Sequence, residues 1–318
     1  MILFCGIASE PPLALAIEAA VRRGFEHLVF NQRQAQHCEI AVDHANGRLT
    51  GRLWANEREW PLEKFTGVYC RLIETEALPE NQQGRRAAAD PTRLARSVFL
   101  QQALSDWMEV AECRVVNRAA AMSSNVSKPY QAQLISRFFP TPPTLVTNSP
   151  DKAREFIAAH KRVIYKSISS IRSIVREWST ADEPKLDKIR ALPTQFQGFI
   201  SGTNIRAHVV GRKVFATEIT SPAVDYRYAQ RDELDVEMRP IELPPEVAEK
   251  CRELACHLQL PFCGIDLKLT EQNAYYCFEV NPSPAYSYYQ YYTEQPIADA
   301  LVDYLAGITE ERHACASG

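Results

Sequence analysis

Two acidic residues and one amide, Asp266, Glu279 and Asn281, have the chemistry and spacing of a metal site. Side chains two residues apart on a strand share a face, so Glu279 and Asn281 point the same way. A hairpin that turns about Gln272-Asn273 places Asp266 opposite Glu279, with the β-carbons ~5 Å apart. Facing carboxylates repel each other unless a cation lies between them, and magnesium prefers carboxylate and amide oxygens together with phosphate oxygens.

The same acids also fit an ordinary solvated hairpin in which they face each other by chance. Their apolar neighbours predict that one side of the hairpin packs against a core while the acids lie on the other side. Those neighbours are Ile265, Leu267, Phe278 and Val280. The pattern alone leaves both interpretations open.

Two lysines are candidates for contacts with phosphate groups. Lys166 lies near the end of an apolar strand predicted over 163–167, and the hydroxyl-rich turn 167–173 follows it. Backbone N–H groups and hydroxyls in such a turn can hold phosphate oxygens beside an ammonium group. Lys128 begins a predicted helix after Asn125 and is a similar candidate. Each lysine, taken alone, also fits a side chain that extends into solvent.

Arg206 lies on a predicted strand over 204–210, which a Gly211-Arg212 turn joins to a strand over 213–219. Asn204 shares its face, and Thr217 lies opposite Arg206 in this register. A fixed cation there could hold a transferring phosphoryl group. Arg227, in the following loop, is a second arginine of this kind. Both also fit ordinary surface arginines.

The elements that position these residues predict a mixed α/β (α+β) chain. A strand, an amphipathic helix and a second strand at the start are typical of an open α/β sheet. The first strand–helix turn lacks the glycine pattern of a dinucleotide site. Further strands are predicted over 40–42, 49–54, 67–72, 115–117, 163–167, 173–178, 195–200, 264–269 and 275–280. Further helices are predicted over 94–108, 127–138, 245–257 and 296–305, with another beginning at Ser149-Pro150.

Composition excludes several classes of function. The 318 residues include 36 basic and 39 acidic ones, which gives no electrostatic footprint for nucleic acid or an anionic membrane. No apolar run reaches the ~18 residues of a spanning helix, and the start predicts a strand rather than a signal peptide. The 12 glycines are about half the average share of ~7%, which argues against a glycine-rich phosphate loop.

The 9 cysteines are odd in number, scattered and without a CxxC pair. This pattern argues against a disulfide framework and a zinc site, and it favours a reducing, cytoplasmic compartment. Five of the 13 tyrosines lie within 286–292. They fit either an aromatic wall beside a substrate or ordinary packing against the sheet. Arg71 and Arg118 are further candidates for binding a carboxylate or a peptide, and each also fits a structural role.

Together and in this order, the motifs resemble the ATP-grasp superfamily. The strand lysine, polar loop, Gln-x-Phe-Ile hinge, Asn-Ile-Arg segment and Asp…Glu-x-Asn-Pro pattern are most similar to the glutathione-synthetase/RimK-like ligases, which include ligases that modify ribosomal peptides. The resemblance covers roughly 115–305. It implies an ATP-grasp fold with a smaller N-terminal open α/β domain. That domain would span 1–114, and the central and C-terminal ATP-grasp subdomains would span 115–196 and 197–318.

The resemblance also implies roles for individual residues, with ATP and Mg2+ as cofactors. The magnesium ligands would be Asp266, Glu279 and Asn281. The residues around the nucleotide would be Lys128, Lys166, Ser167, Ser169, Ser170, Gln197, Phe199, Ile200 and Asn204, with Gln197, Phe199 and Ile200 forming the hinge at the adenine. Arg206 and Arg227 would steady the transferring phosphate. The usual Asn…Gly-Gly segment after the second arginine is replaced by 228–232 here, which makes Arg227 the least typical match.

The activity that the resemblance implies is ATP-dependent carboxylate–amine ligation. A carboxylate on a small molecule or peptide would attack the γ-phosphorus of ATP, giving ADP and an acyl phosphate. An amine acceptor would then displace phosphate to form an amide bond. Related ligases are often homo-oligomers. Two alternatives stay open at this point: a kinase that phosphorylates a small-molecule hydroxyl on the same scaffold, and a non-catalytic module that binds a nucleotide or peptide.

Overall fold

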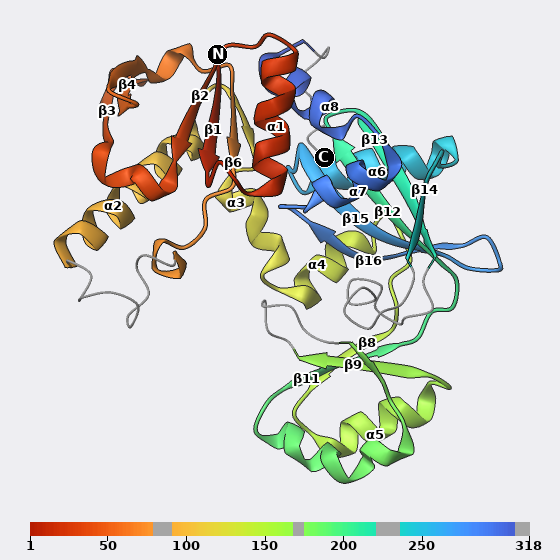
Figure 1. Cartoon of the computed structure of the whole chain (residues 1–318). Helices are drawn as coiled ribbons and strands as arrows, with labels where there is room; N and C mark the ends of the chain where they lie inside the picture. Colours follow the sequence, from red (N-terminus) through yellow and green to blue (C-terminus); the bar gives the residue numbers. More distant parts are fainter. Residues whose placement is uncertain (79–90, 168–174, 221–235, 309–318) are drawn as a thin grey trace.

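The first part of the chain forms a parallel sheet with strand order β2-β1-β6-β7. The computed structural model describes residues 1–78, 91–167, 175–220 and 236–308 (Figure 1). Helix α1 packs on one face of this sheet and helix α2 on the other. The expected open α/β beginning is therefore confirmed. The elements are β1 (Ile2–Gly6), α1 (Pro11–Arg22), β2 (His27–Asn31), β6 (Gly67–Cys70), α2 (Pro91–Val110) and β7 (Arg114–Val116).

A small antiparallel sheet flanks this domain, with strand order β3-β4-β5. Its first turn, Asn46-Gly47, has positive φ at both residues, as a two-residue hairpin requires. Short 3-10 helices connect the neighbouring elements. The bounds are η1 (Gln32–His37), β3 (Glu39–Ala45), β4 (Arg48–Ala55), β5 (Arg58–Pro61), η2 (Leu62–Lys64) and η3 (Thr75–Ala77).

A separate small lobe, green at the bottom of Figure 1, is built on an antiparallel sheet with strand order β10-β9-β11-β8. Ser149 caps helix α5 by accepting from the backbone N–H of Lys152, and proline follows at the first turn, as predicted. Phe196 and Val163 point into the core beneath α5 and η5, so Gln197 and Ile164 face the other way. The elements are β8 (Thr144–Thr147), α5 (Pro150–Ala159), β9 (Val163–Ser167), β10 (Arg176–Glu177), η5 (Thr180–Arg190) and β11 (Thr194–Gly198).

The C-terminal part is an antiparallel sheet with strand order β14-β13-β12-β15-β16. Helices α4 and α6 cover one face, and α7 and α8 pack toward the N-terminal domain. The bounds are α3 (Ala119–Met122), η4 (Ser123–Asn125), α4 (Lys128–Ile135), β12 (Thr203–Val210), β13 (Lys213–Thr220), β14 (Glu237–Ile241), α6 (Pro245–His257), β15 (Phe262–Leu269), β16 (Tyr275–Asn281), α7 (Tyr286–Thr293) and α8 (Ile297–Ala306).

The predicted pairing of Asp266 with Glu279 is confirmed, but the predicted apolar face of this hairpin is wrong at one residue. Leu267 pairs with Cys277, so the register shifts after Asp266 and Phe278 is the additional residue of a bulge. Cys277 is therefore fully buried in the core, and Phe278 turns toward the opposite side.

The sheets also refine the expected division of the chain. Strand β7 is hydrogen-bonded to β6, so the first sheet extends to Val116, two residues beyond the expected end at 114. Helix α4, which follows, packs on β16 rather than on the small lobe. We propose three parts close to 1–114, 115–196 and 197–318, with the small sheet confined to 144–198.

Seven cysteines in the described ranges are free thiols, and most lie in the core as small apolar side chains. Cys256 differs from them in being disulfide-bonded. None of the helices placed by the structure combines the length and apolar character needed to cross a membrane.

Tyr286 joins the N-terminal and C-terminal parts. Its ring is fully buried and meets Phe262 edge-on, with 5.3 Å between ring centres. Its hydroxyl donates a 2.7 Å hydrogen bond to the carbonyl of Pro12 in α1. Because burial disfavours the phenolate, the pKa of Tyr286 is raised well above its ordinary value, and the hydroxyl stays a donor.

We expect Tyr286→Ala to lower the free energy of unfolding by about 3–5 kcal/mol, because it empties a packed aromatic site. Tyr286→Phe removes only the hydrogen bond and should cost about 1 kcal/mol. Urea unfolding measures both. Tyr291→Ala, at a side chain that is 80% exposed on the same helix, is the control and should change stability by less than about 0.5 kcal/mol. Equal effects of Tyr286→Ala and Tyr291→Ala would contradict the prediction.

Candidate functional site

Asp266 and Glu279 face each other on β15 and β16, and each acid is paired with a cation from a distant segment. Arg206 Nη1 lies 2.6 Å from Asp266 Oδ1, and Lys128 Nζ lies 2.6 Å from Glu279 Oε1. The acid side chains are 29% and 26% exposed. Lys128 also donates to Asn125 Oδ1 at 2.8 Å. Two half-buried acids and two cations thus form one compact group of charges.

Arg206 is held tightly on several sides. Besides Asp266, its Nε lies 3.5 Å from His208 Nε2, and its guanidinium lies 5.7 Å from the ring centre of Tyr289. His208 is fully buried, and this burial lowers its pKa well below the ordinary value, so the neutral ring accepts from the arginine. A β-carbon at Gly264 would lie 2.0 Å from Arg206 Nη2. The guanidinium therefore occupies the space that any larger residue at 264 would fill.

A pocket lies between the small lobe and the C-terminal sheet, beside this group of charges. Strands β9 and β11 supply one wall, and β12, β15 and β16 supply the other. Asp266 and Glu279 contribute acidic side chains to its lining, and Ile164 and Phe278 contribute apolar ones. The predicted site residues in its lining are Lys166, Gln197, Phe199, Ile200, Asn204, Asp266 and Glu279.

The predicted hinge runs along the edge of this pocket and is held by backbone hydrogen bonds. Gly198 N donates to Pro143 O and Phe199 N donates to Arg162 O, both at 2.9 Å. Gln197 Nε2 donates to Thr144 Oγ1 at 3.0 Å. The hinge is thus fixed to the small lobe, and its side chains reach the pocket.

Other predicted residues lie differently. Asn281 follows Glu279 at the strand spacing, but its Oδ1 accepts a 2.9 Å hydrogen bond from Ser283 N, and the residue is outside the pocket lining. Ser167 is exposed at the end of β9 and is also outside the lining. Ser169, Ser170 and Arg227 lie outside the described residues, as do most of the serine-rich turn and the segment 228–232.

The two additional arginine candidates have structural partners. Arg118 donates to the carbonyls of Met108 and Ala111 and caps the end of α2. Arg71 grips both carboxylate oxygens of Glu10, at 2.7 and 2.6 Å, and also donates to Ser283 Oγ at 3.0 Å. Arg71 therefore ties the N-terminal domain to the segment that follows β16. Of the tyrosine group, Tyr289 contacts the site and Tyr286 belongs to the core, whereas Tyr291 and Tyr292 are exposed.

The structure adds site residues that sequence reasoning missed. Ile164, Val175, Lys268 and Phe278 line the pocket, and Gly264 and His208 hold Arg206. A signal existed for Lys268, since it follows Asp266 at the two-residue spacing that puts both on one face. No local signal marked Phe278, because the bulge that turns it into the pocket is a property of strand pairing.

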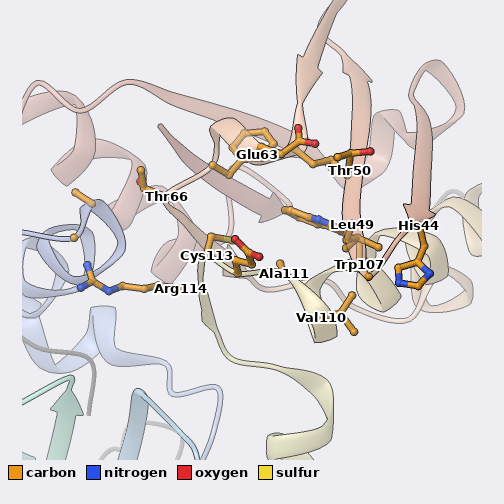
Figure 2. A pocket seen from close by; sticks show the side chains of 16 residues that line it. His44, Leu49, Thr50, Glu63, Thr66, Trp107, Val110, Ala111, Cys113 and Arg114 are labelled. Atoms are coloured by element: carbon orange, nitrogen blue, oxygen red, sulfur yellow. The ribbon is translucent and has the colours of Figure 1, made fainter. Parts of the chain in front are cut away.

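A larger cavity of ≈ 830 Å³ lies in the N-terminal domain (Figure 2). Its lining comes from the β3–β4 sheet and the ends of α2 and α8, and includes Trp107, Glu63 and Arg114. None of the predicted site residues lines it. Within the described ranges, no group of three or more histidine, cysteine and acidic side chains gathers to hold a metal. To hold a metal ion, the pair Asp266 and Glu279 would need further oxygen ligands from an amide and from phosphate.

Comparison with known proteins locates the family. The RimK-like ATP-grasp domain matches residues 128–305, which is 178 of the 318 residues. A search of curated proteins finds no match. Several solved structures are similar in fold over nearly the whole chain.

One is a Chryseobacterium gregarium RiPP-associated ATP-grasp ligase in complex with ADP and a leader and core peptide. It is 21% identical, with 98% of this chain and 97% of that chain covered, at a TM-score of 0.78. The macrocyclase MdnC from Microcystis aeruginosa MRC, bound with precursor peptide MdnA, is 18% identical, with 97% and 100% covered, at 0.77. The ATP-grasp ligase PsnB, complexed with minimal precursor, is 24% identical, with 97% and 99% covered, at 0.77.

These identities show a shared fold. The family match spans more than half of the sequence and includes both facing acids, the two lysines and the hinge. This chain belongs to the RimK-like ATP-grasp family.

Proposed function

We propose that the protein is an ATP-dependent carboxylate–amine ligase that acts on a carboxylate of a peptide or small molecule. The observation that carries the proposal is the pair of facing acids, each held by a cation, in a pocket that the hinge residues also line. Solved relatives support it: one is complexed with ADP and a leader and core peptide, and PsnB is complexed with minimal precursor, Mg and ADP.

The residues present fit ATP and magnesium. Asp266 and Glu279 supply carboxylate oxygens on adjacent strands, and Asn281 supplies an amide at the same end of the sheet, which is the hard oxygen donor set that magnesium prefers. When bound, magnesium would neutralise charge on the β- and γ-phosphates. We place Lys128 and Lys166 on the phosphates, with Ser167, Ser169 and Ser170, and the hinge residues Gln197, Phe199 and Ile200 at the adenine. Asn204 would lie near the ribose.

In the proposed reaction, a substrate carboxylate oxygen attacks the γ-phosphorus of ATP and ADP leaves, giving an acyl phosphate. A deprotonated amine then attacks the acyl carbon and phosphate leaves, so the chain need supply no general base. Arg206, with Arg227 as a second candidate, would stabilise the charge that spreads over the transferring phosphoryl oxygens, and catalysis is mostly positioning and electrostatics. A cytoplasmic location and a homo-oligomeric state are parts of the same proposal.

Arg206 can act in this way because its guanidinium is already in place. Asp266, His208 and Tyr289 surround it, and the missing side chain at Gly264 leaves room for it. A preorganised donor loses little free energy by reorganising during the reaction, which is why such contacts contribute strongly to catalysis.

We expect Asp266→Ala and Glu279→Ala each to lower the rate of ADP formation about 100-fold or more, because each removes a magnesium ligand. The assay follows ADP release with Mg·ATP, a panel of peptides containing Asp and Glu, and an added amine. Glu271→Ala, in the exposed turn of the same hairpin, is the matched control and should keep wild-type activity. Full activity in the Asp266 and Glu279 variants would show that the metal assignment is wrong.

Hydroxylamine distinguishes ligation from hydroxyl phosphorylation. Since an acyl phosphate reacts with hydroxylamine, we expect a hydroxamate of the substrate to form together with an equal amount of ADP, as detected by mass spectrometry. A stable phosphorylated product without hydroxamate would indicate a kinase. Binding of Mg·ADP with no turnover over the panel would indicate a nucleotide-binding module instead.

Gly264→Ala tests the placement of Arg206. The added methyl group displaces the end of a flexible side chain, so we expect a reduction in kcat of about 10-fold or more, with Mg·ADP affinity within about threefold of wild type. In an Arg206→Ala background, the clash no longer exists, and Gly264→Ala should add almost nothing to the loss of kcat. The double-mutant cycle is thus strongly non-additive. Additive losses would mean that Gly264 acts independently of Arg206.

A further inference from the structure

Lys268 is a half-buried cation in the pocket that the mechanism above does not use. It follows Asp266 by two residues on β15, lies opposite Asn204 on β12 and lines the pocket. Its Nζ lies 5.3 Å from the ring centre of Phe199 and 5.7 Å from that of Phe278. The ammonium group is therefore flanked by two aromatic rings at the hinge side of the pocket.

Lys268 differs from its neighbouring cations in its partners. Lys128 is paired with Glu279, and Arg206 with Asp266. Arg162, whose guanidinium lies 3.7 Å from the Phe199 ring centre, is paired with Glu177. In the part of the chain that the structure describes, Lys268 makes no hydrogen bond or ion pair and contacts only the two rings as a cation.

This setting favours an acceptor supplied by a ligand. Because Lys268 is half-buried, its ammonium group loses part of the water that would otherwise surround it. Cation–π contacts offset part of this loss, but an aromatic ring supplies no nitrogen or oxygen acceptor for the N–H donors. A ligand nitrogen or oxygen within reach would satisfy those donors.

The position of Lys268 on β15 indicates which part of a bound nucleotide it would contact. With a rise of ~3.3 Å per strand residue, its Cα lies ~7 Å from that of Asp266, toward the hinge residue Phe199 and away from Arg206. The proposed function puts the phosphates beside Asp266 and Glu279. Lys268 is therefore at the nucleoside end.

We propose that Lys268 binds the nucleoside part of the nucleotide, donating a hydrogen bond to a purine ring nitrogen or a ribose oxygen. The inference rests on the proposed nucleotide site and deepens it by assigning a charged, hydrogen-bonding contact beside the hinge, where Phe199 and Phe278 supply aromatic rings. Lys268 contributes to nucleotide affinity and not to the chemical step.

The test compares ADP with adenosine, which lacks phosphate. Calorimetry gives the dissociation constant of Mg·ADP, and competition against ADP gives that of adenosine, for wild type, Lys268→Met, Lys268→Arg and Lys250→Met. We expect Lys268→Met to weaken both ligands by the same factor of about 10, the size of one hydrogen bond from a charged donor. Lys268→Arg keeps a donor and should stay within about threefold of wild type. Lys250→Met, on the exposed side of α6, should change neither ligand.

Three other results would overturn the proposal, and they differ from one another. Unchanged affinities in a folded Lys268→Met, with an unchanged thermal midpoint, would show that Lys268 contacts no part of the nucleotide. Weaker ADP with unchanged adenosine would mean that Lys268 contacts phosphate. Failure of wild type to bind either ligand would overturn the proposed function itself, and the inference with it. If Lys268→Met fails to fold, a Lys268→Gln variant takes its place, and in that variant adenosine and ADP must weaken together.

Discussion

Electrostatic repulsion between Asp266 and Glu279 is the constraint around which the site is built. Two unit charges ~5 Å apart repel by about 3 kcal/mol at an effective dielectric constant of ~20. The chain offsets this repulsion with Lys128, from the first turn of α4, and Arg206, from the neighbouring strand. Lys128 and Arg206 are also the cations proposed to contact phosphate. The charged groups that pair with one another within the protein are therefore the groups that would contact a nucleotide and magnesium.

The rest of the fold serves to keep that group of charges in place. One face of the C-terminal sheet packs against α4 and α6, and the facing acids Asp266 and Glu279 lie on the other face. The segment after Glu279 is fixed from the N-terminal domain: Asn117 Nδ2 donates to the carbonyls of Phe262 and Pro282, and Arg71 holds Ser283. The N-terminal domain therefore stabilises the end of β16, and the small lobe supplies the other wall of the pocket.

Much of the local structure could be predicted from residue patterns. The glycine-first turn at Gly211 and the alternation on either side set the register that places Thr217 opposite Arg206, and Ser149 caps its helix as its type and position indicate. Lys166 and Asn204, which the sequence predicts at a nucleotide, both line the pocket. Phe278 was placed on the wrong face because a bulge shifts the strand by one residue, and such a shift depends on the partner strand rather than on the local sequence.

The sequence by itself determined the strand periods, the helix caps, the turn types and the order of motifs that identifies the ATP-grasp family, because these depend on residues close together along the chain. Only the tertiary structure decided which side chains pair with one another. Lys128 meets Glu279 across 151 residues, and Arg71 meets Glu10 across 61 residues. The absence of a side chain at Gly264 leaves space for the guanidinium of Arg206. Lys268 is a cation that lies near two aromatic rings. Distance, burial and charge pairing are set by the packing of remote segments, which no local pattern encodes.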